Sequence, residues 1–317
     1  MRGAPLPEAS QPAEKPDLTA VILTFNEAHH ISRAIASVRD VAREVLVVDS
    51  FSTDNTVAMA EAAGARILQR SFTSHAAQLQ WALDHGGITT GWTLRLDADE
   101  LIEPDLARAI AQTLPRLDAD VTGITLNRKH IFMGRWIRHG GRYPLWLLRL
   151  WRTGAGRVEQ RWMDEHVVVD RGRTIRLVGG FADANGGDLT FFTAKHNGYA
   201  TREAIEVLAA RHALFNATPA ALTGQARRKR IIKTRIYDHL PLWAGPAGYF
   251  LYRYVCQRGF LDGRAGLIYH LLQGFWYRFL VAAKVAEWEG ELAACRSREE
   301  RLARLAALSG LPIAPPA

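Results

Sequence analysis

The sequence has little cysteine and no long uncharged apolar run. Only two of its 317 residues are cysteines, Cys256 and Cys295. This count excludes a disulfide framework and a cysteine-rich zinc site, and it favours a reducing compartment such as the cytosol. No stretch of about 18 uncharged apolar residues exists, so no transmembrane helix is predicted. Residues 1–17 lack the apolar core of a signal peptide, and we expect them to form a flexible leader.

Acidic residues are in short supply. There are 32 acidic residues against 40 basic ones, which gives a net charge of +8. A basic protein is attracted to anionic partners, so nucleic acid, a nucleotide, lipid phosphate and an anionic membrane all remain candidates at this point. The chain is 48% hydrophobic, which excludes general disorder. Its length suits one large domain with an extension.

The first hundred residues alternate between short apolar strands and amphipathic helices. Strands are predicted at 18–25, 44–48, 65–68 and 92–96. Helices are predicted at 31–38, from the Ser-Thr-Asp of 52–54 to Ala63, at 76–83 and from Pro104 onward. This alternation predicts an α/β fold, with a mostly parallel sheet covered by helices on both faces.

Polar side chains follow three of these strands. Asn26 and Glu27 follow the first strand, Asp49 ends the second, and Asp97 and Asp99 follow the fourth. Ligands bind beyond the carboxyl ends of the strands in such sheets. The sequence therefore predicts one site at that edge.

The pattern changes after about residue 120. Strands are predicted at 121–127, 145–151 and 167–169, and a helix at 199–214. From residue 227 the chain is basic, aromatic and helical in pattern. We therefore expect three parts: a leader at 1–17, a catalytic domain at 18–215 and a helical extension at 216–317.

Asp97 and Asp99 are candidate metal ligands. In an extended segment, two carboxylates separated by one residue share a face. Such a pair suits Mg²⁺ or Mn²⁺, which bind carboxylate oxygens together with substrate phosphates. The alternative is a solvated acidic turn before the helix at Pro104. Asp49 can accept hydrogen bonds from a uracil N–H or from ribose hydroxyls. The alternative is that Asp49 is an ordinary turn residue. Asp54 is interpreted as a helix-start residue.

Three motifs carry a resemblance to a known family. They are residues 21–27 (Val-Ile-Leu-Thr-Phe-Asn-Glu), 47–56 (Val-Val-Asp-Ser-Phe-Ser-Thr-Asp-Asn-Thr) and 96–100 (Leu-Asp-Ala-Asp-Glu). In order and spacing, residues 18 to about 105 resemble the family 2 glycosyltransferases with the GT-A fold, a Rossmann-like nucleotide-diphospho-sugar transferase fold. The resemblance is greatest to the branch that builds lipopolysaccharide core and exopolysaccharide.

The resemblance implies roles for individual residues. Asp49 would hold the uridine of a nucleotide-sugar, Asp97 would face the ribose or the metal, and Asp99 would bind the metal directly. The rest of the nucleotide-sugar pocket would be formed by Thr24, Phe25, Asn26 and Glu27.

Two positions depart from the family pattern. The common Asp-Asp-Gly-Ser element is Asp-Ser-Phe-Ser here, so that Phe51 stands where relatives have Gly. A common Lys-Asn or Arg-Asn pair is replaced by Leu79-Gln80. We expect uracil recognition through Asp49 and either Gln78 or Gln80, whereas the donor sugar stays undefined.

An inverting transfer requires a base for the acceptor hydroxyl. In the family such a base lies in a short acidic motif, and residues 162–166 (Trp-Met-Asp-Glu-His) contain one. Asp164 and Glu165 point to opposite sides of an extended segment, so only one can be the base, and Asp164 is preferred. The alternative is a pair that forms a salt bridge near Arg161.

Two further segments contain candidate ligands. Residues 140–144 and 148–152 resemble a Tyr-Pro…Arg-Leu-Phe-Arg segment of the same branch, so Arg149 or Arg142 is a candidate to contact donor phosphates or an anionic acceptor. The alternative is a glycine-flanked turn into a core strand. Residues 195–197 (Lys-His-Asn) are expected just before a helix, with His196 either near a pyrophosphate or in a helix-start role.

The C-terminal extension combines positive charge with aromatic residues. Residues 227–230 are Arg-Arg-Lys-Arg, and an apolar stripe runs from Ile268 to Ala283. Such a pattern favours a helix at a membrane surface, or else an amphipathic helix packed on the catalytic domain. No nucleic-acid module accompanies the charge, so we expect no nucleic-acid partner.

Together these features predict an inverting glycosyltransferase. It would transfer a hexose, glucose or a related sugar, from a UDP-sugar to a glycan or glycolipid acceptor such as a lipid-linked lipopolysaccharide or exopolysaccharide precursor. We expect it in the cytoplasm, peripheral on the inner membrane. One alternative is a sugar nucleotidyltransferase, although residues 24–27 are not the glycine-rich loop of that class. The other is a non-catalytic membrane-surface scaffold on a degenerate GT-A fold, although the Asp97/Asp99 pair is intact.

Overall fold

The computed structural model describes residues 15–159, 166–215, 241–311 and 313. They form two compact units. Unit 1 contains the chain up to Lys129 and Pro144–Asn185, and unit 2 contains His130–Tyr143 and the chain from Gly186. The boundary predicted after residue 215 differs from this division, because the helix before it packs within unit 2.

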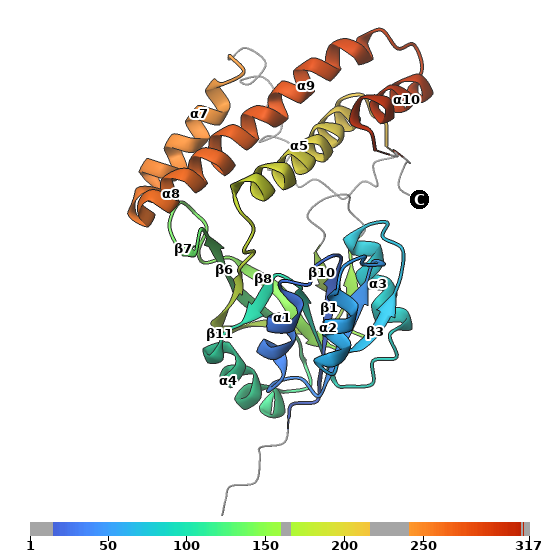
Figure 1. The fold of residues 1–317 in the computed structure, drawn as a ribbon, viewed down its shortest axis with the longest axis vertical. Helices are drawn as coiled ribbons and strands as arrows, with labels where there is room; N and C mark the ends of the chain where they lie inside the picture. Colours follow the sequence, from blue (N-terminus) through green and yellow to red (C-terminus); the bar gives the residue numbers. More distant parts are fainter. Residues whose placement is uncertain (1–14, 160–165, 216–240, 312, 314–317) are drawn as a thin grey trace, which may run out of the picture. The chain divides into compact units, whose positions relative to one another are not determined.

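Unit 1 is built around a mixed β-sheet (Figure 1). Its strand order is β3-β2-β1-β4-β8-β6-β11-β5. The first four strands in this order are parallel, whereas β8 is antiparallel to both β4 and β6, and β5 is antiparallel to β11. The α/β class is confirmed, and the parallel part is the part predicted from the sequence. The strands are β1 (Leu18–Thr24), β2 (Glu44–Asp49), β3 (Arg66–Gln69), β4 (Trp92–Asp97), β5 (Glu100–Ile102), β6 (Val121–Phe132), β8 (Trp146–Arg152) and β11 (Arg173–Asp183).

Both faces of this sheet are covered. Alternate residues of β1 enter two cores: Leu18, Ala20 and Ile22 pack on one face, and Val21 and Leu23 on the other. The first face meets α1 (Ile31–Val38), α2 (Thr56–Ala62) and α4 (Pro104–Thr113). The second meets α3 (His75–His85) and the hairpin of β9 (Gly156–Val158) and β10 (Val167–Val169).

Local signals in the sequence set several helix ends. α1 and the start of α4 at Pro104 agree with the prediction. Ser74 caps α3 by accepting a hydrogen bond from the Ala77 N–H at 3.1 Å. α2 begins at Thr56, later than predicted, and the chain leaves it through Gly64 at φ +84°. A single 3₁₀ turn, η1 (Leu114–Arg116), follows α4.

Unit 2 is mainly helical (Figure 1). Within it α5 packs along α9, and α7 packs against the π-helical segment η4. Its core contains Phe132, Ile137 and Tyr269, from the end of β6, from β7 and from α8. Its elements are β7 (Arg135–Ile137), α5 (Leu189–Arg211), α7 (Ala244–Leu251), η2 (Tyr252–Cys256), η3 (Gly259–Asp262), α8 (Gly263–Tyr269), η4 (His270–Trp276), α9 (Tyr277–Ala293) and α10 (Arg298–Ser309).

The start of α5 corrects a sequence prediction. The helix was expected from residue 199, after Lys195, His196 and Asn197, but it begins at Leu189 and contains all three. Asp188 sets this start, because its side chain accepts a hydrogen bond from the Phe191 N–H at 2.8 Å. His196 therefore lies inside a helix, and its helix-start role is wrong. Burial lowers the pKa of His196, which favours the neutral ring.

No helix within the described ranges is both long and apolar enough to span a bilayer.

Candidate functional site

The sheet register brings the predicted acidic residues to one edge of unit 1. Strand β1 lies between β2 and β4, with Thr24 opposite Asp49 and Leu23 opposite Asp97. Parallel strands are spaced by 4.7–4.9 Å, so the backbones at Asp49 and Asp97 are about 10 Å apart across β1. The carboxyl ends of β1, β2 and β4 thus bring polar residues to a common edge, and two of these strands end in an aspartate. The Thr24 hydroxyl at the end of β1 is buried without a hydrogen-bond partner in the described residues.

Hydrogen bonds join the loops that follow β1 and β2. The Asn26 N–H donates to the Ser52 Oγ at 2.8 Å, and the Asn26 side chain accepts from the Thr53 N–H at 2.8 Å. The Glu27 N–H donates to the Thr56 Oγ1 at 2.7 Å. These bonds fix the first loop against the second while the Phe25 side chain remains 54% exposed. An exposed aromatic ring beside a rigid loop is available to stack on a ligand.

Asp49 is fully buried and holds the second loop. Its carboxylate accepts hydrogen bonds from the Ser52 N–H at 2.9 Å, the Ser52 Oγ at 2.5 Å and the Gln69 Nε2 at 3.0 Å. Gln78 lies beside this strand end, where its Nε2 donates to the Ser50 Oγ at 2.7 Å. The structure therefore brings Asp49 and Gln78 together.

Asp54 lies at the start of α2, as predicted. Its Oδ1 accepts from the Thr56 N–H at 3.0 Å, and its Oδ2 accepts from the Ala28 N–H at 3.2 Å. Burial alone would raise the pKa of Asp54, but these bonds and the one from the Thr56 hydroxyl outweigh it and lower the pKa. The carboxylate thus joins the two loops in its charged form.

The Asp97-Ala98-Asp99 motif is a strand end followed by a turn. Asp97 is the last residue of β4, and Ala98 and Asp99 form the turn into β5. The extended alternation assumed for this motif is therefore wrong, because the chain reverses at Ala98. Asp99 is held from β11 instead: its Oδ2 accepts from the Asn185 Nδ2 at 3.0 Å, and its carbonyl accepts from the Ala184 N–H at 3.0 Å.

Two arginines surround Asp97. Its carboxylate lies 3.4 Å from the Arg95 Nε and 3.5 Å from an Arg149 guanidinium nitrogen. Burial would raise the pKa of Asp97, but the charges of Arg95, Arg149 and His75 outweigh it and hold the pKa well below its usual range. Asp97 is therefore ionised at any physiological pH.

Glu100 is a residue of this site that the sequence reasoning missed. Its side chain is 2% exposed. Its Oε1 accepts a hydrogen bond from Arg149 at 2.7 Å, and its Oε2 accepts one from the Asp97 N–H at 3.0 Å. Burial raises the pKa of Glu100 to about 8, with Arg149 opposing the shift and Asp97, Asp183 and Asp99 adding to it. The available signal was its place as the last residue of the motif at 96–100. Arg149 is 5% exposed and is bonded to Glu100 and Asp97 through one guanidinium nitrogen, whereas its Nη1 is buried without a hydrogen-bond partner in the described residues. Its contact with donor phosphates stays a prediction.

The acidic residues around Asp99 fit a divalent cation bound together with substrate. Among the described residues, no three His, Cys, Asp or Glu side chains are grouped to hold a metal by themselves. Mg²⁺ is commonly bound by one or two carboxylates plus substrate phosphates rather than by a protein cage. Asp97 and Asp99 would supply those carboxylates, and Asp183 and Glu100 place further acidic groups close by.

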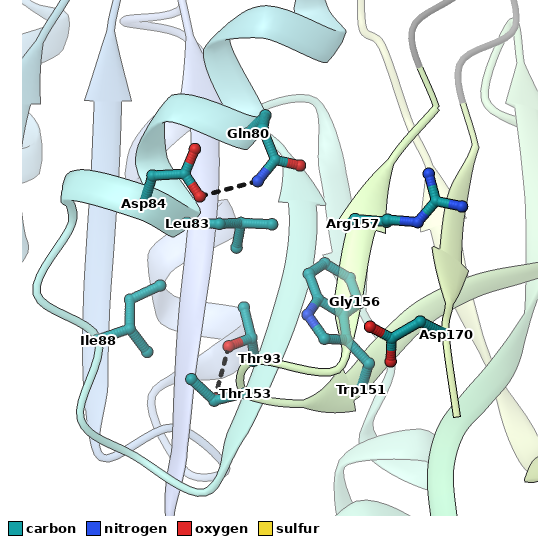
Figure 2. A pocket seen from close by; sticks show the side chains of 11 residues that line it. Gln80, Leu83, Asp84, Ile88, Thr93, Trp151, Thr153, Gly156, Arg157 and Asp170 are labelled. Atoms are coloured by element: carbon teal, nitrogen blue, oxygen red, sulfur yellow. Dashed lines mark hydrogen bonds between the residues drawn. The ribbon is translucent and has the colours of Figure 1, made fainter. Parts of the chain in front are cut away.

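Gln80 lies apart from this edge. Its Nε2 donates to Asp84 at 2.9 Å and its Oε1 accepts from the Val158 N–H at 2.9 Å. It lines a pocket of about 240 Å³ between α3, β4 and the β8–β9 turn, and Figure 2 shows its hydrogen bond to Asp84. This pocket adjoins Thr93, near the start of β4, whereas Asp97 ends that strand. Gln78 is thus the glutamine near Asp49.

The predicted base and the basic cluster are not part of this description. Asp164, Glu165 and residues 227–230 lie outside the described residues.

Comparison with known proteins gives the family. The family described as "Glycosyl transferase family 2" matches residues 19–177, which includes all of the strand ends above. The chain belongs to glycosyltransferase family 2. The resemblance seen in the three sequence motifs is thereby confirmed.

Several curated relatives are similar to this family member. An uncharacterized glycosyltransferase of Rickettsia felis is 42% identical over 89 residues, which are 28% of this chain and 31% of that protein. The chain thus matches about a third of the length of such relatives. The lipopolysaccharide core biosynthesis glycosyltransferase LpsC of Rhizobium meliloti is 26% identical over 281 residues, 84% of this chain and 91% of that one.

Solved structures show only a partial likeness. Glucosyl-3-phosphoglycerate synthase from Mycobacterium tuberculosis, in complex with Mn²⁺, UDP and glucosyl-3-phosphoglycerate, matches with a TM-score of 0.30 and 20% identity, over 36% of this chain and 43% of that one. Mannosyl-3-phosphoglycerate synthase from Rubrobacter xylanophilus matches with a TM-score of 0.31 at 20% identity, over 36% and 40% of the two chains. Similarity at this level carries no information about the ligands of this protein.

Proposed function

We propose that this protein is an inverting glycosyltransferase that transfers a hexose from a UDP-sugar to a lipid-linked lipopolysaccharide or exopolysaccharide acceptor. One observation carries the proposal. Asp49 ends β2 and Asp97 ends β4, on either side of β1, and Asp99 lies in the turn that follows Asp97, while Arg95 and Arg149 keep Asp97 ionised. Carboxylates at that edge of a nucleotide-binding sheet suit a nucleotide and a cation.

The residues of this edge divide between nucleotide and cation. Asp49, at the end of β2, and Gln78, in α3, bind the uridine, and the exposed Phe25 ring covers it. Asp97 faces the ribose or the cation, and Asp99 is the direct ligand of Mg²⁺ or Mn²⁺. When bound, the cation offsets the charge of the departing diphosphate. Glu100 and Arg149 act through Asp97: they hold its backbone N–H and its carboxylate in place.

The transfer itself requires one proton acceptor. The acceptor hydroxyl oxygen forms a bond to the anomeric carbon as the bond from that carbon to the diphosphate breaks, and the hydroxyl proton passes to a carboxylate. Asp164 or Glu165 takes that proton, and Asp164 is the preferred choice. Attack on the face opposite the diphosphate inverts the anomeric configuration.

The proposed acceptor class is supported by a relative that matches most of the chain. LpsC is named for lipopolysaccharide core biosynthesis and matches 84% of this chain. An acceptor of that kind is anchored in lipid, so an enzyme that uses it works at the cytoplasmic face of the inner membrane. A peripheral position there agrees with the net charge of +8.

Binding of UDP-sugars to the purified protein tests the proposal. In calorimetric titrations, UDP-glucose is expected to bind with Mn²⁺ and to lose at least about tenfold in affinity with a chelator or in Asp99→Asn, because a carboxylate ligand of the cation is gone. Asp40→Asn, an exposed acid beyond α1, is the matched control and should bind normally. Metal-independent binding that Asp99→Asn leaves intact would overturn the cation assignment. Release of pyrophosphate from UTP and a sugar phosphate would identify a nucleotidyltransferase instead.

A further inference from the structure

Exposed apolar side chains gather in one short stretch of unit 2. Of the 17 large hydrophobic residues that are exposed in the described part of the chain, ten lie between residues 242 and 271. A patch of this kind on a folded surface usually marks an interaction site. The ten are Leu242, Trp243, Tyr249, Leu251, Tyr252, Val255, Phe260, Leu261, Leu267 and Leu271.

These residues lie on a helical hairpin, residues 242–276. Its first arm is α7 with η2, its second arm is α8 with η4, and α7 packs against η4. The connection between the arms contains Phe260 and Leu261, which are 47% and 50% exposed. Leu267 and Leu271 are four residues apart and share one side of the second arm. The apolar surface therefore includes the tip and the outer sides of the hairpin.

Buried polar contacts hold the hairpin from inside unit 2. The Arg253 Nε donates to the Gly140 carbonyl at 2.7 Å, and Arg253 is 3% exposed. Asp262 accepts from the His139 N–H at 2.9 Å and lies 2.6 Å from the His139 Nδ1. Buried polar contacts of this kind fix the arms while the apolar side chains face outward.

The charge of this region selects one kind of partner. Between residues 241 and 286 there are five basic residues and one acidic residue. Arg253 is buried and Arg278 forms an ion pair with Glu203 at 2.7 Å, whereas Arg258 and Arg264 are exposed on the hairpin. The one acid, Asp262, is buried against His139. Residues 216–317 contain 15 basic and 7 acidic residues, whereas residues 1–215 contain 25 of each. The whole net charge of +8 thus belongs to the C-terminal part. Exposed apolar and aromatic residues beside uncompensated positive charge complement a bilayer that contains anionic lipid.

We infer that the hairpin of residues 242–276 docks on the surface of an anionic lipid bilayer. Leu251, Phe260 and Leu261 enter the boundary between headgroups and acyl chains, where half-exposed apolar surface leaves water. The Trp243, Tyr249 and Tyr252 rings lie at the headgroup level, and Arg258 and Arg264 meet lipid phosphates. The hairpin lies on the membrane, because no described helix can cross it. This inference deepens the proposed function by naming the surface that would bring the enzyme to a lipid-linked acceptor.

The two cysteines provide a direct test. Cys256 is exposed at the end of η2 in the hairpin, and Cys295 follows α9 in a segment with several glutamates. An environment-sensitive fluorophore is attached to Cys256 in a Cys295→Ser protein, and to Cys295 in a Cys256→Ser protein. With vesicles of phosphatidylglycerol and phosphatidylcholine in equal parts, the label on Cys256 should shift to the blue and the label on Cys295 should not. Vesicles of phosphatidylcholine alone should give a much smaller shift.

A substitution that removes the apolar contacts provides the second measurement. Leu251→Gln/Phe260→Gln/Leu261→Gln keeps the charge and should weaken vesicle binding by about tenfold or more in flotation assays. Val178→Gln, in β11 and 83% exposed, is the control and should bind as the native protein does. A melting curve verifies that the triple variant is folded.

The possible outcomes separate this inference from the proposed function. Vesicle binding without a response at Cys256 would place the contact elsewhere and overturn the inference. A protein that transfers sugar in solution but binds no anionic vesicles at low salt would also overturn it, while the proposed function stands. A Cys256 shift that grows with protein concentration in the absence of vesicles would identify a second copy of the chain as the occupant. Docking by a protein that binds no nucleotide-sugar would leave the inference and remove the proposed function.

Discussion

At the scale of single residues, Phe51 departs from its family and has an unusual backbone conformation. It occupies the left-handed region at φ +62° and its side chain is 51% exposed. For residues other than glycine, this backbone conformation destabilises the folded state by about 1 kcal/mol or more. Glycine, which the family resemblance predicts at this position, adopts this conformation without strain. Phe51 keeps the conformation because Asp49 and Ser52 hold the loop on both sides.

Phe51→Gly is therefore expected to leave the stability of the protein unchanged or to raise it slightly. Relief of the left-handed strain stabilises the folded state by about 1 kcal/mol, and the greater freedom of glycine in the unfolded chain offsets part of this gain. Thermal melting without ligand measures the effect. Phe25→Gly, at the neighbouring exposed aromatic without positive φ, is the control and should lose stability. If the Tm of Phe51→Gly falls by more than that of the control, packing of the Phe51 ring outweighs the strain.

The single residues of the site could be predicted where a strand ends in a polar group. Asp49, Asp97 and Asp99 were found in this way, since the end of a buried strand is visible in the sequence. Asn185 was not found, although it donates to Asp99. The two residues are 86 positions apart, and only the antiparallel pairing of β11 with β5 brings them together. Pairing over such a distance leaves no local pattern.

At the scale of elements, the segment after β7 packs closely on the hairpin of unit 2. Gly140 has φ +66°, and a Cβ there would lie 2.1 Å from the Cε1 of His270. Gly134, in the β6–β7 turn, has a similar φ of +71° but no atom within 4 Å of such a Cβ. The two glycines thus share a backbone conformation and differ only in their surroundings.

Gly140→Ala is expected to cost clearly more stability than Gly134→Ala. The left-handed backbone destabilises both variants by about 1 kcal/mol, and in Gly140→Ala overpacking against the buried His270 ring destabilises the folded state by roughly 1–3 kcal/mol more. Chemical denaturation of both proteins measures the difference. Equal losses would mean that His270 moves aside at no cost and that this contact does not fix the hairpin.

The same contact makes unit 2 sensitive to acid. His270 is fully buried in η4, and its ring nitrogens have no hydrogen-bond partner in the described residues. Burial is the main reason that the pKa of His270 is lowered from 6.5 to about 4. The charges of Arg253 and Arg142 also lower this pKa, whereas the charge of Asp262 raises it. The folded pKa lies below the unfolded one, so the contribution of neutral His270 is complete above pH 6.5 and is lost as the pH falls towards 4.

His270→Leu is therefore expected to flatten the acid side of the stability profile. Between pH 6.5 and 4 the native protein should lose up to about 3 kcal/mol more than the variant, because only the native ring takes up a proton on unfolding. Denaturation curves at several pH values measure this difference. Parallel profiles for the two proteins would show that His270 titrates normally, and a difference that grows above pH 7 would have the wrong sign.

Helices and strands could be predicted where the spacing of apolar residues and the residues that begin or end an element indicate the same structure. The strands β1, β2, β4 and β10 and the helix α1 were expected within a residue or two of their observed bounds. β11 was missed because Gly179 and Gly180 interrupt its apolar pattern. Gly179 is required there by a neighbour, since a Cβ would lie 2.7 Å from the Leu106 backbone in α4. Tertiary packing of this kind overrides strand propensity.

At the scale of the whole molecule, charge is divided along the sequence. Residues 1–215 are neutral overall, with 25 basic and 25 acidic residues, and residues 216–317 contain the net charge of +8. Six basic residues fall between 227 and 235, directly before the hairpin in the chain. Net charge does not determine a fold, but it determines which surfaces a protein approaches. The division indicates that nucleotide chemistry belongs to the first part and attraction to an anionic surface to the second.

Removing the cluster at 227–230 should therefore separate the two activities. Each basic residue near an anionic surface contributes roughly 1 kcal/mol, so changing Arg227, Arg228, Lys229 and Arg230 to alanine should weaken binding to anionic vesicles on the order of a hundredfold or more. The loss should shrink as salt is added, because screening already weakens the native contact. UDP-glucose binding should be unchanged, since Asp49, Asp97 and Asp99 lie in the neutral part. Co-sedimentation at two salt concentrations, beside a melting curve, provides the measurement. A quadruple variant that melts earlier but keeps its vesicle affinity would show that these residues support the fold and not the membrane contact.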